Sequence, residues 1–433
     1  MRRIGAWGVI AAVVGLVVLT AAMASWWRFP THIRLLPGQE YALYTGPLFS
    51  VSEEKSDPDS LHDGVLFAAG TSPILRSDQI GSHNLTLNMF GVIPVRAASV
   101  EVVPEVLVVP GGQAVGVLLA KSGFMVERTV AVQGMDDVEY HPAQKAGIRS
   151  GDILVEIGGF ELTRIRQVEE IAAFYGIRRM KAPVVVERAG ERLCLEIEPV
   201  LGRDPAGSGQ RYLLGLVLKD PIAGVGTLTF WDPHSRRYGA LGHLITDDNR
   251  AAVVIKDGRI VPAYIHGIQP GEKGRPGEKL GLFEEDGNTL GTIDDNTDFG
   301  IYGKLLMLPH SANQPVPVAL ASQVKPGPAY ILTVLDGERV ESFEIEIVSV
   351  NRQSRPNAKG LVIKVTDPRL ISRTNGIIQG MSGSPILQDN RLVGAVTHVF
   401  VNDPLKGYGI LAEFMVYGAG ITQDESERRQ PAA

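Results

Sequence analysis

The stretch Gly380-Met381-Ser382-Gly383-Ser384-Pro385 decides how the C-terminal part of this chain is interpreted. Glycines on both sides of the first serine permit a tight turn that exposes its hydroxyl group. A serine hydroxyl becomes a nucleophile when a base takes its proton and when hydrogen-bond donors face the oxyanion that forms on a carbonyl. The backbone N–H groups of Gly380 and Ser382 are placed to supply those donors. The stretch therefore predicts a nucleophilic serine beside an oxyanion hole.

The residues that follow this loop predict a β-hairpin. An apolar run over 385–387 leads into the turn 389–391, and a second apolar run continues over 392–398. Trypsin-like proteases follow their serine loop in the same way, and the loop resembles theirs, although Met381 replaces an acidic residue and Ser384 a glycine. The second strand is expected to wall a substrate pocket, which assigns three residues to it: Thr397, His398 and Val399.

Short apolar runs continue through the rest of the C-terminal region, residues 201–433. Examples lie at 226–230, 252–255 and 330–334, and each is bounded by glycine, Asp-Gly or asparagine. The chain holds 49 glycines and 27 prolines, spread along its length as turns between short strands would require. Because the region has no convincing long helix, we expect a mainly β fold with a chymotrypsin-like double β-barrel over 201–433.

The base that would activate Ser382 is expected to be His243. Small residues precede this histidine in the run 238–245, so the strand end can approach the serine loop closely. Its interval to the serine is also close to that of chymotrypsin-type enzymes. The rival histidines are His234, His266, His310 and His398.

An acidic residue that orients the histidine is harder to choose. Chymotrypsin-type spacing favours one of the aspartates 286, 294, 295 and 298. Asp367, shortly before the serine, is the other candidate, and its simplest alternative role is a turn before Pro368. Sequence spacing leaves both possibilities open.

The segment over residues 105–200 resembles a PDZ domain. Its most specific stretch runs from Pro142 to Ile153, with the pattern PAxxAGIxxGDI. The resemblance implies that the glycine-rich turn 111–117 cradles a peptide carboxylate and that the next strand pairs with an extended peptide. This interpretation assigns peptide binding to Gly112, Val115, Gly116 and Val117. The alternative is a small β-domain that docks on its neighbour.

The N-terminal residues 1–27 favour a membrane segment. Arg2 and Arg3 precede an uncharged stretch over 4–27 that is long enough to span a bilayer as a transmembrane helix. The competing interpretation is a signal peptide cleaved near residues 22–24. Either one exports the rest of the chain, which begins with a β-rich linker region over 28–104. The sequence thus predicts a single-pass membrane protein or a secreted one.

The overall composition excludes other classes of function. The formal net charge is −6 without a long basic run, which argues against a nucleic-acid partner. The single cysteine, Cys194, rules out an internal disulfide and a CxxC metal site. We therefore expect neither a metal nor a cofactor.

Three blocks of sequence resemble one family closely. They are residues 238–243, residues 379–385 and residues 394–404, and together they are similar to stage IV sporulation protein B, a serine peptidase of endospore-forming bacteria. The resemblance covers nearly the whole chain. It implies that His243 and Ser382 are catalytic, and it favours Asp367 as the third catalytic residue.

The resemblance also implies a biological role. Such a protein is exported into the space between the two membranes around the forespore, where it cleaves itself and a membrane-bound regulatory protein. That cleavage leads to activation of the late mother-cell sigma factor. Two alternatives remain at this point: a non-catalytic PDZ scaffold with a degenerate protease domain, and a general envelope quality-control protease. In the latter class the PDZ domain normally follows the protease, whereas here it precedes it.

Overall fold

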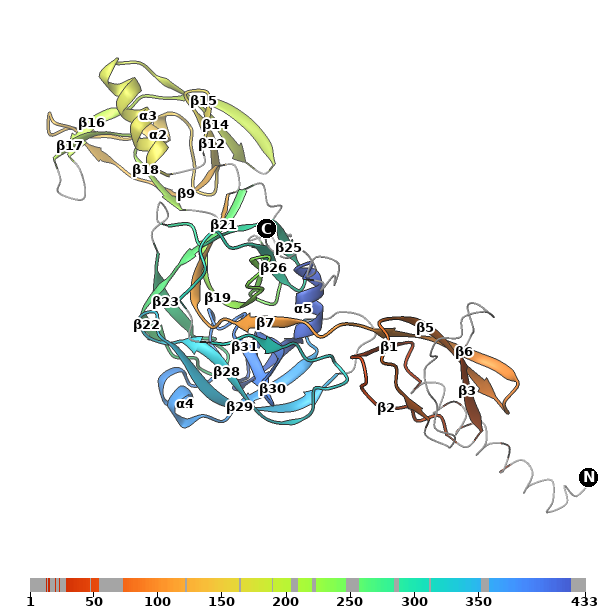
Figure 1. Ribbon diagram of the computed structural model, residues 1–433. Helices are drawn as coiled ribbons and strands as arrows, with labels where there is room; N and C mark the ends of the chain where they lie inside the picture. The colour runs from red at the N-terminus through yellow and green to blue at the C-terminus, as the bar shows by residue number, and fades with distance from the viewer. Residues whose placement is uncertain are drawn as a thin grey trace, which may run out of the picture.

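The computed structural model describes most of the chain as three lobes, numbered below by their order in the sequence, and the C-terminal lobe lies between the other two in space (Figure 1). The described residues are 29–46, 48–53, 73–120, 123–162, 165–188, 190–203, 209–219, 223–246, 257–283, 288–310, 313–351 and 358–421, with 13, 15, 20 and 23.

The N-terminal lobe is a four-stranded sheet with the order β1-β6-β5-β3. Leu85 and Leu87 alternate with polar residues along one of its strands and are fully buried, as a sheet with one covered face requires. A short β2–β4 ladder accompanies the sheet. The elements are β1 (His32–Leu35), β2 (Tyr41–Ala42), β3 (Phe49–Glu53), β4 (Ile74–Leu75), β5 (Gly81–Met89) and β6 (Ile93–Val102).

The middle lobe combines a sheet with two helices over residues 123–219. Its sheet has the order β15-β14-β12-β9-β18, and buried residues such as Val168 and Ala172 of α3 pack on it. The elements are β9 (Phe124–Thr129), β10 (Val132–Gln133), β11 (Glu139–Tyr140), α2 (Pro142–Lys145), β12 (Ile153–Ile157), β13 (Phe160–Glu161), α3 (Ile165–Ile177), β14 (Ala182–Arg188), β15 (Glu191–Ile197), β16 (Val200–Arg203), β17 (Gln210–Leu213) and β18 (Leu216–Lys219).

A nine-stranded sheet forms the first half of the third lobe. Its strands come from before and after the middle lobe in the sequence. Its main path is β24-β21-β8-β19-β20-β26-β25, with β7 and β27 at its margin. The elements are β7 (Leu107–Pro110), β8 (Ala114–Ala120), β19 (Ala223–Trp231), β20 (Arg237–Ala240), β21 (Asp257–Pro262), β24 (Gly291–Ile293), β25 (Asp295–Thr297), β26 (Gly300–Lys304) and β27 (Val316–Pro317). A hairpin of β22 (Tyr264–Gln269) and β23 (Glu278–Leu282) adjoins it.

This sheet corrects the position that we expected for the peptide-binding loop. Gly112 lies just before β8, and Val115, Gly116 and Val117 lie within it, paired on one side with β19 and on the other with β21. The sequence of this strand is a continuous apolar run, which fits any sheet that is covered on both faces, so it did not reveal which lobe would take it. These four residues therefore belong to the third lobe, and the middle lobe begins after them.

A closed six-stranded barrel forms the second half of the third lobe. Its strand order is β28-β29-β30-β33-β32-β31. Phe343, Ile345 and Ile347 point into its core while Glu344 and Glu346 are exposed, which is the period-two pattern of a half-buried strand. The elements are β28 (Gly327–Val334), β29 (Val340–Val350), β30 (Leu361–Val365), α4 (Pro368–Thr374), β31 (Pro385–Gln388), β32 (Arg391–Phe400), β33 (Asp403–Leu411) and α5 (Ala412–Gly418).

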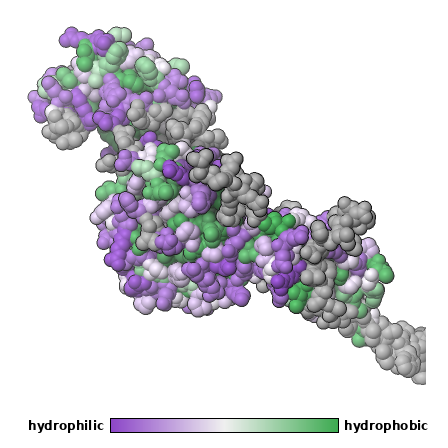
Figure 2. Space-filling model, viewed as in Figure 1, coloured by the Kyte–Doolittle hydropathy of each residue, from purple (hydrophilic) through white to green (hydrophobic). Residues whose placement is uncertain are grey.

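The expected fold class needs one correction. Its mainly β character with two barrel-like sheets agrees with the structure. In the part of the chain that the structure describes, however, no helix is long and apolar enough to cross a membrane, which differs from the transmembrane helix in the expected fold class. The segment 1–27, on which that prediction fell, lies almost entirely outside the described residues. On the face drawn in Figure 2, the described surface of all three lobes is largely hydrophilic, with smaller hydrophobic patches between.

Candidate active site

The serine loop lies between α4 and β31 of the closed barrel. Gly380 and Gly383 adopt φ angles of +88° and +91°, which side chains with a Cβ rarely take. The turn between them brings Ser382 to the surface of a cavity, as the glycines predicted. The Ser382 hydroxyl donates a hydrogen bond to the carbonyl oxygen of Thr397 at 2.9 Å.

Backbone amides of the loop divide into two groups. Those of Met381, Gly383 and Ser384 donate to the carbonyls of Ile378, Val396 and Met381. The N–H groups of Gly380 and Ser382 have no acceptor among the described residues. These are the two donors that the sequence assigned to an oxyanion hole, and the fold leaves them available for a substrate carbonyl.

His243 follows β20 through a strained turn. Leu241 and Gly242 have φ angles of +67° and +73°, and the imidazole lies half-buried beyond them. Its Nδ1 lies 2.9 Å from the carbonyl oxygen of Leu244. Because a carbonyl only accepts, Nδ1 carries the proton and Nε2 keeps a free lone pair. Burial lowers the pKa of His243, opposed by this hydrogen bond, so the ring is neutral at pH 7.

Contact between the two halves of the third lobe places His243 opposite the serine. A Cβ at Gly383 would collide with the carbonyl of Thr227 and the backbone nitrogen of Leu241, so only glycine lets the backbones meet. Thr227 also binds the serine loop directly. Its N–H donates to the Ser382 carbonyl at 3.0 Å, and its hydroxyl donates to the Gly380 carbonyl at 2.8 Å.

Ser382 and His243 open on one cavity of about 590 Å³. The residues that we assigned to a substrate pocket, Thr397, His398 and Val399, line the same cavity. Serine and histidine face this shared space without a hydrogen bond between them among the described contacts. Catalytic hydrogen bonds in an empty site are often long and form only when substrate binds.

A second imidazole stands beside the first. The ring centroids of His398 and His243 are 5.1 Å apart, with the rings tilted by 43°. Burial, His243 and Lys359 lower the pKa of His398 to about 4. His398 is therefore neutral at physiological pH and contributes a polar wall to the cavity rather than a charge.

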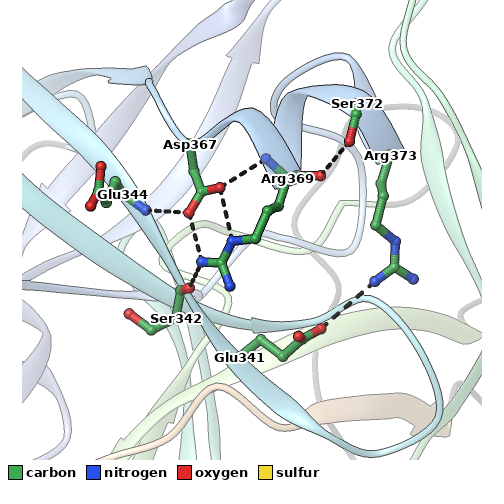
Figure 3. Close-up of polar contacts among 7 residues, drawn as sticks. All are labelled: Glu341, Ser342, Glu344, Asp367, Arg369, Ser372 and Arg373. Carbon is green, nitrogen blue, oxygen red and sulfur yellow. Dashed lines mark hydrogen bonds and ion pairs between the residues drawn. The ribbon is translucent and has the colours of Figure 1, made fainter.

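Asp367 lies elsewhere in the closed barrel. It caps the N-terminus of α4, and its carboxylate accepts hydrogen bonds from Arg369 and from the backbone N–H of Glu344 (Figure 3). Its partners, Arg369 first among them, lower the pKa of Asp367 to about 2. Its described hydrogen bonds do not include His243, and it lines neither described cavity beside that residue. Asp298 does line the second cavity, of about 600 Å³, together with His243 and His398.

Two features of the site were not found from the sequence. The Leu244 carbonyl takes the position at Nδ1 that we gave to an acid, and a backbone group leaves no sequence signal. Asn296 accepts from the Ile245 N–H at 2.8 Å and donates to its carbonyl at 2.9 Å, which fixes the segment after His243. The sequence analysis considered the neighbouring aspartates because they are charged, and it did not consider this uncharged amide.

Part of this chain is similar to known proteins. Residues 210–416 match the family model described as SpoIVB peptidase S55. Among solved structures, the chain is similar to the active form of the Rv3671c protease from M. tuberculosis, with 16% identity, coverage of 49% of this chain and 78% of that chain, and a TM-score of 0.27. An inactive form of the same protease has 16% identity, coverage of 46% and 85%, and a TM-score of 0.25. No curated protein matches the chain. The match over residues 210–416 therefore supports a serine peptidase of the SpoIVB type.

Proposed function

We propose that this peptidase is an extracytoplasmic endopeptidase of sporulation signalling. It would cleave itself and a membrane-bound regulatory protein in the space between forespore and mother-cell membranes, and so trigger activation of the late mother-cell sigma factor. The family match and the three sequence blocks support this role. The observation that carries the chemistry is that Ser382, His243 and Gly380 line one cavity, and that the N–H groups of Gly380 and Ser382 have no acceptor among the described residues.

In the proposed mechanism, Nε2 of His243 takes the proton of the Ser382 hydroxyl as that oxygen attacks a peptide carbonyl. For this step the hydroxyl must leave the Thr397 carbonyl, its present acceptor. The N–H groups of Gly380 and Ser382 stabilise the oxyanion of the tetrahedral intermediate. His243 then passes the proton to the leaving amine, and water releases the acyl group by the same route in reverse. The Leu244 carbonyl holds the required tautomer throughout.

The decisive experiment compares the purified full-length chain with its Ser382→Ala variant. We expect the parent chain to process itself and to cleave its regulatory substrate, and the variant to lose both activities by up to ~10⁶-fold. Identical fragments from parent and variant would refute the proposal, because they would come from another nucleophile or another enzyme. Cleavage of unrelated unfolded proteins at the same rate would instead favour a quality-control protease.

We also propose that the middle lobe binds a peptide terminus, at a place different from the one expected. In the described sheet β18 is an edge strand, and the turn before it contains Gly215 with a φ of +69°. Tyr212 packs on Gly176 of α3 beside this turn. An extended peptide would add to β18 and end near residues 213–216. A labelled peptide with a free C-terminal carboxylate should bind more tightly than its amidated form, and equal binding would contradict the proposal.

A further inference from the structure

Lys279 is a buried lysine that the proposed mechanism leaves unused. It lies on β23 with 4% of its surface exposed. Its Nζ donates a hydrogen bond to the hydroxyl oxygen of Thr333 on β28 at 2.7 Å. No ion pair joins it to a carboxylate among the described residues, and burial lowers its pKa to about 7. Burying an amine in this way costs desolvation free energy. The contacts of Lys279 therefore indicate its role.

Those contacts lead to the serine loop from two directions. On the near side, the backbone N–H of Lys279 donates to the Gln379 carbonyl at 3.0 Å. The lysine stem also fills the space next to Gly380, where a Cβ would lie 3.1–3.2 Å from its Cβ, Cγ and Cδ atoms. One residue therefore supports both the peptide before Gly380 and Gly380 itself.

On the far side, the connection runs through Thr333. Its hydroxyl oxygen accepts from Lys279 and also from the Ser384 hydroxyl, at 3.1 Å. A hydroxyl oxygen has two lone pairs, so it can accept both hydrogen bonds at once. All three side-chain groups are buried, where such bonds are stronger than in water. Lys279 is thus linked to the loop on both sides of Ser382.

We propose that Lys279 is a positioning residue of the peptidase, which holds the loop 379–384 so that the Gly380 N–H stays directed at the substrate carbonyl. This inference rests on the proposed roles of Ser382 and the oxyanion hole. Oxyanion stabilisation depends on donors that are fixed before the reaction, and small displacements reduce the rate strongly. Substrate binding, in contrast, uses cavity walls that Lys279 does not form.

The experiment uses substitutions in the full-length chain that keep shape and remove hydrogen bonds. Lys279→Met retains most of the stem, and Thr333→Val retains the volume of threonine without its hydroxyl. Each should lower kcat roughly 10- to 100-fold while KM stays within about twofold. Thr333→Ser, which keeps the hydroxyl, is the matched control and should retain most of the activity. The double variant Lys279→Met/Thr333→Val should lose little more than either single variant, because both break one chain.

Two outcomes would overturn the proposal. One is a parental kcat in folded Lys279→Met and Thr333→Val proteins. The other is a loss confined to thermal stability, with unchanged kcat per folded molecule well below the melting temperature. If Lys279→Met does not fold, the Thr333→Val and Thr333→Ser pair decides the question. A parent chain that loses nothing on Ser382→Ala substitution would instead refute the proposed function itself, so the two failures remain distinguishable.

Discussion

The two halves of the peptidase lobe are built in different ways. The closed barrel that carries Ser382 uses one continuous segment, residues 327–411, in which short turns join three pairs of neighbouring strands, β28–β29, β31–β32 and β32–β33. The sheet that carries His243 joins β7 and β8 to strands that begin only after the middle lobe, with more than 100 residues between. Local pairing of the first kind forms with little loss of chain entropy, and pairing of the second kind costs more.

This difference explains which half the sequence could predict. The hairpin after Ser382 was predicted because its two strands and turn are adjacent in the sequence. The pairing of β8 with β19 and β21 could not be predicted, since an apolar strand carries no mark of its partners. Each half contributes one reacting group, so activity depends on the contact between them.

The largest expected effect separates the two histidines of the cavity. His243→Ala should reduce cleavage about 10⁴- to 10⁶-fold, because no other described group stands ready as base with a fixed tautomer. His398→Ala should change KM more than kcat, and kcat by less than about tenfold, if it only walls the cavity. Steady-state kinetics on a short peptide substrate measure both values. Equal losses in the two variants would mean that the imidazoles act as a pair.

The next largest effect is expected from a substitution at the contact between the two halves of the peptidase lobe. Gly383→Ala forces a Cβ into the backbone of Thr227 and Leu241, in addition to the strain of a φ of +91°. We expect at least a 10²-fold loss of kcat as the loop moves away from His243. Gly327→Ala is the matched control, because its φ is +138° and a Cβ there meets no atom within 4 Å. Both variants should lose roughly 1–3 kcal/mol of folding free energy from backbone strain. Only Gly383→Ala should also lose kcat per folded molecule.

A smaller effect distinguishes the two aspartates. Asp367→Asn keeps a capping side chain on α4 but loses the charged partner of Arg369. The pKa of Asp367 falls from 3.8 to about 2 in the folded state, which corresponds to about 2 kcal/mol, reduced by solvent screening at the exposed Arg369. Since the folded pKa is lowered, this stability is present above pH 3.8 and is lost as the pH falls toward 2.

Denaturant unfolding and kinetics on the same samples test this assignment. We expect Asp367→Asn to be less stable at pH 7, with the difference from the parent shrinking toward pH 2, and with nearly unchanged kcat. Asp298→Asn, beside His243, should show the opposite balance of altered kcat and unchanged stability. An inactive but fully stable Asp367→Asn protein would restore Asp367 to the catalytic role that the family resemblance implied.

The aspartates also show where sequence reasoning reached its limit at the site. The glycines around Ser382 and His243 signal tight turns directly, because few other residues take such φ angles. Asp367 and Asp298 are each a charged residue in a turn, and only their surroundings differ. In the structure, Arg369, two residues later, pairs with Asp367, and the Glu344 amide that completes its environment comes from a distant strand.

The smallest effect concerns the pH dependence of activity and tests His243 alone. Burial lowers the pKa of His243 below 6.5, so the base stays neutral to lower pH and the acid limb of kcat/KM should have its midpoint below pH 6.5. Lys279, with a pKa of about 7, also titrates near this range and could be mistaken for the base. The limb should therefore persist at the same pH in Lys279→Met, at reduced amplitude. A midpoint that moves or disappears in that variant would assign the limb to the lysine, and the pH dependence would then report on the serine loop instead of on His243.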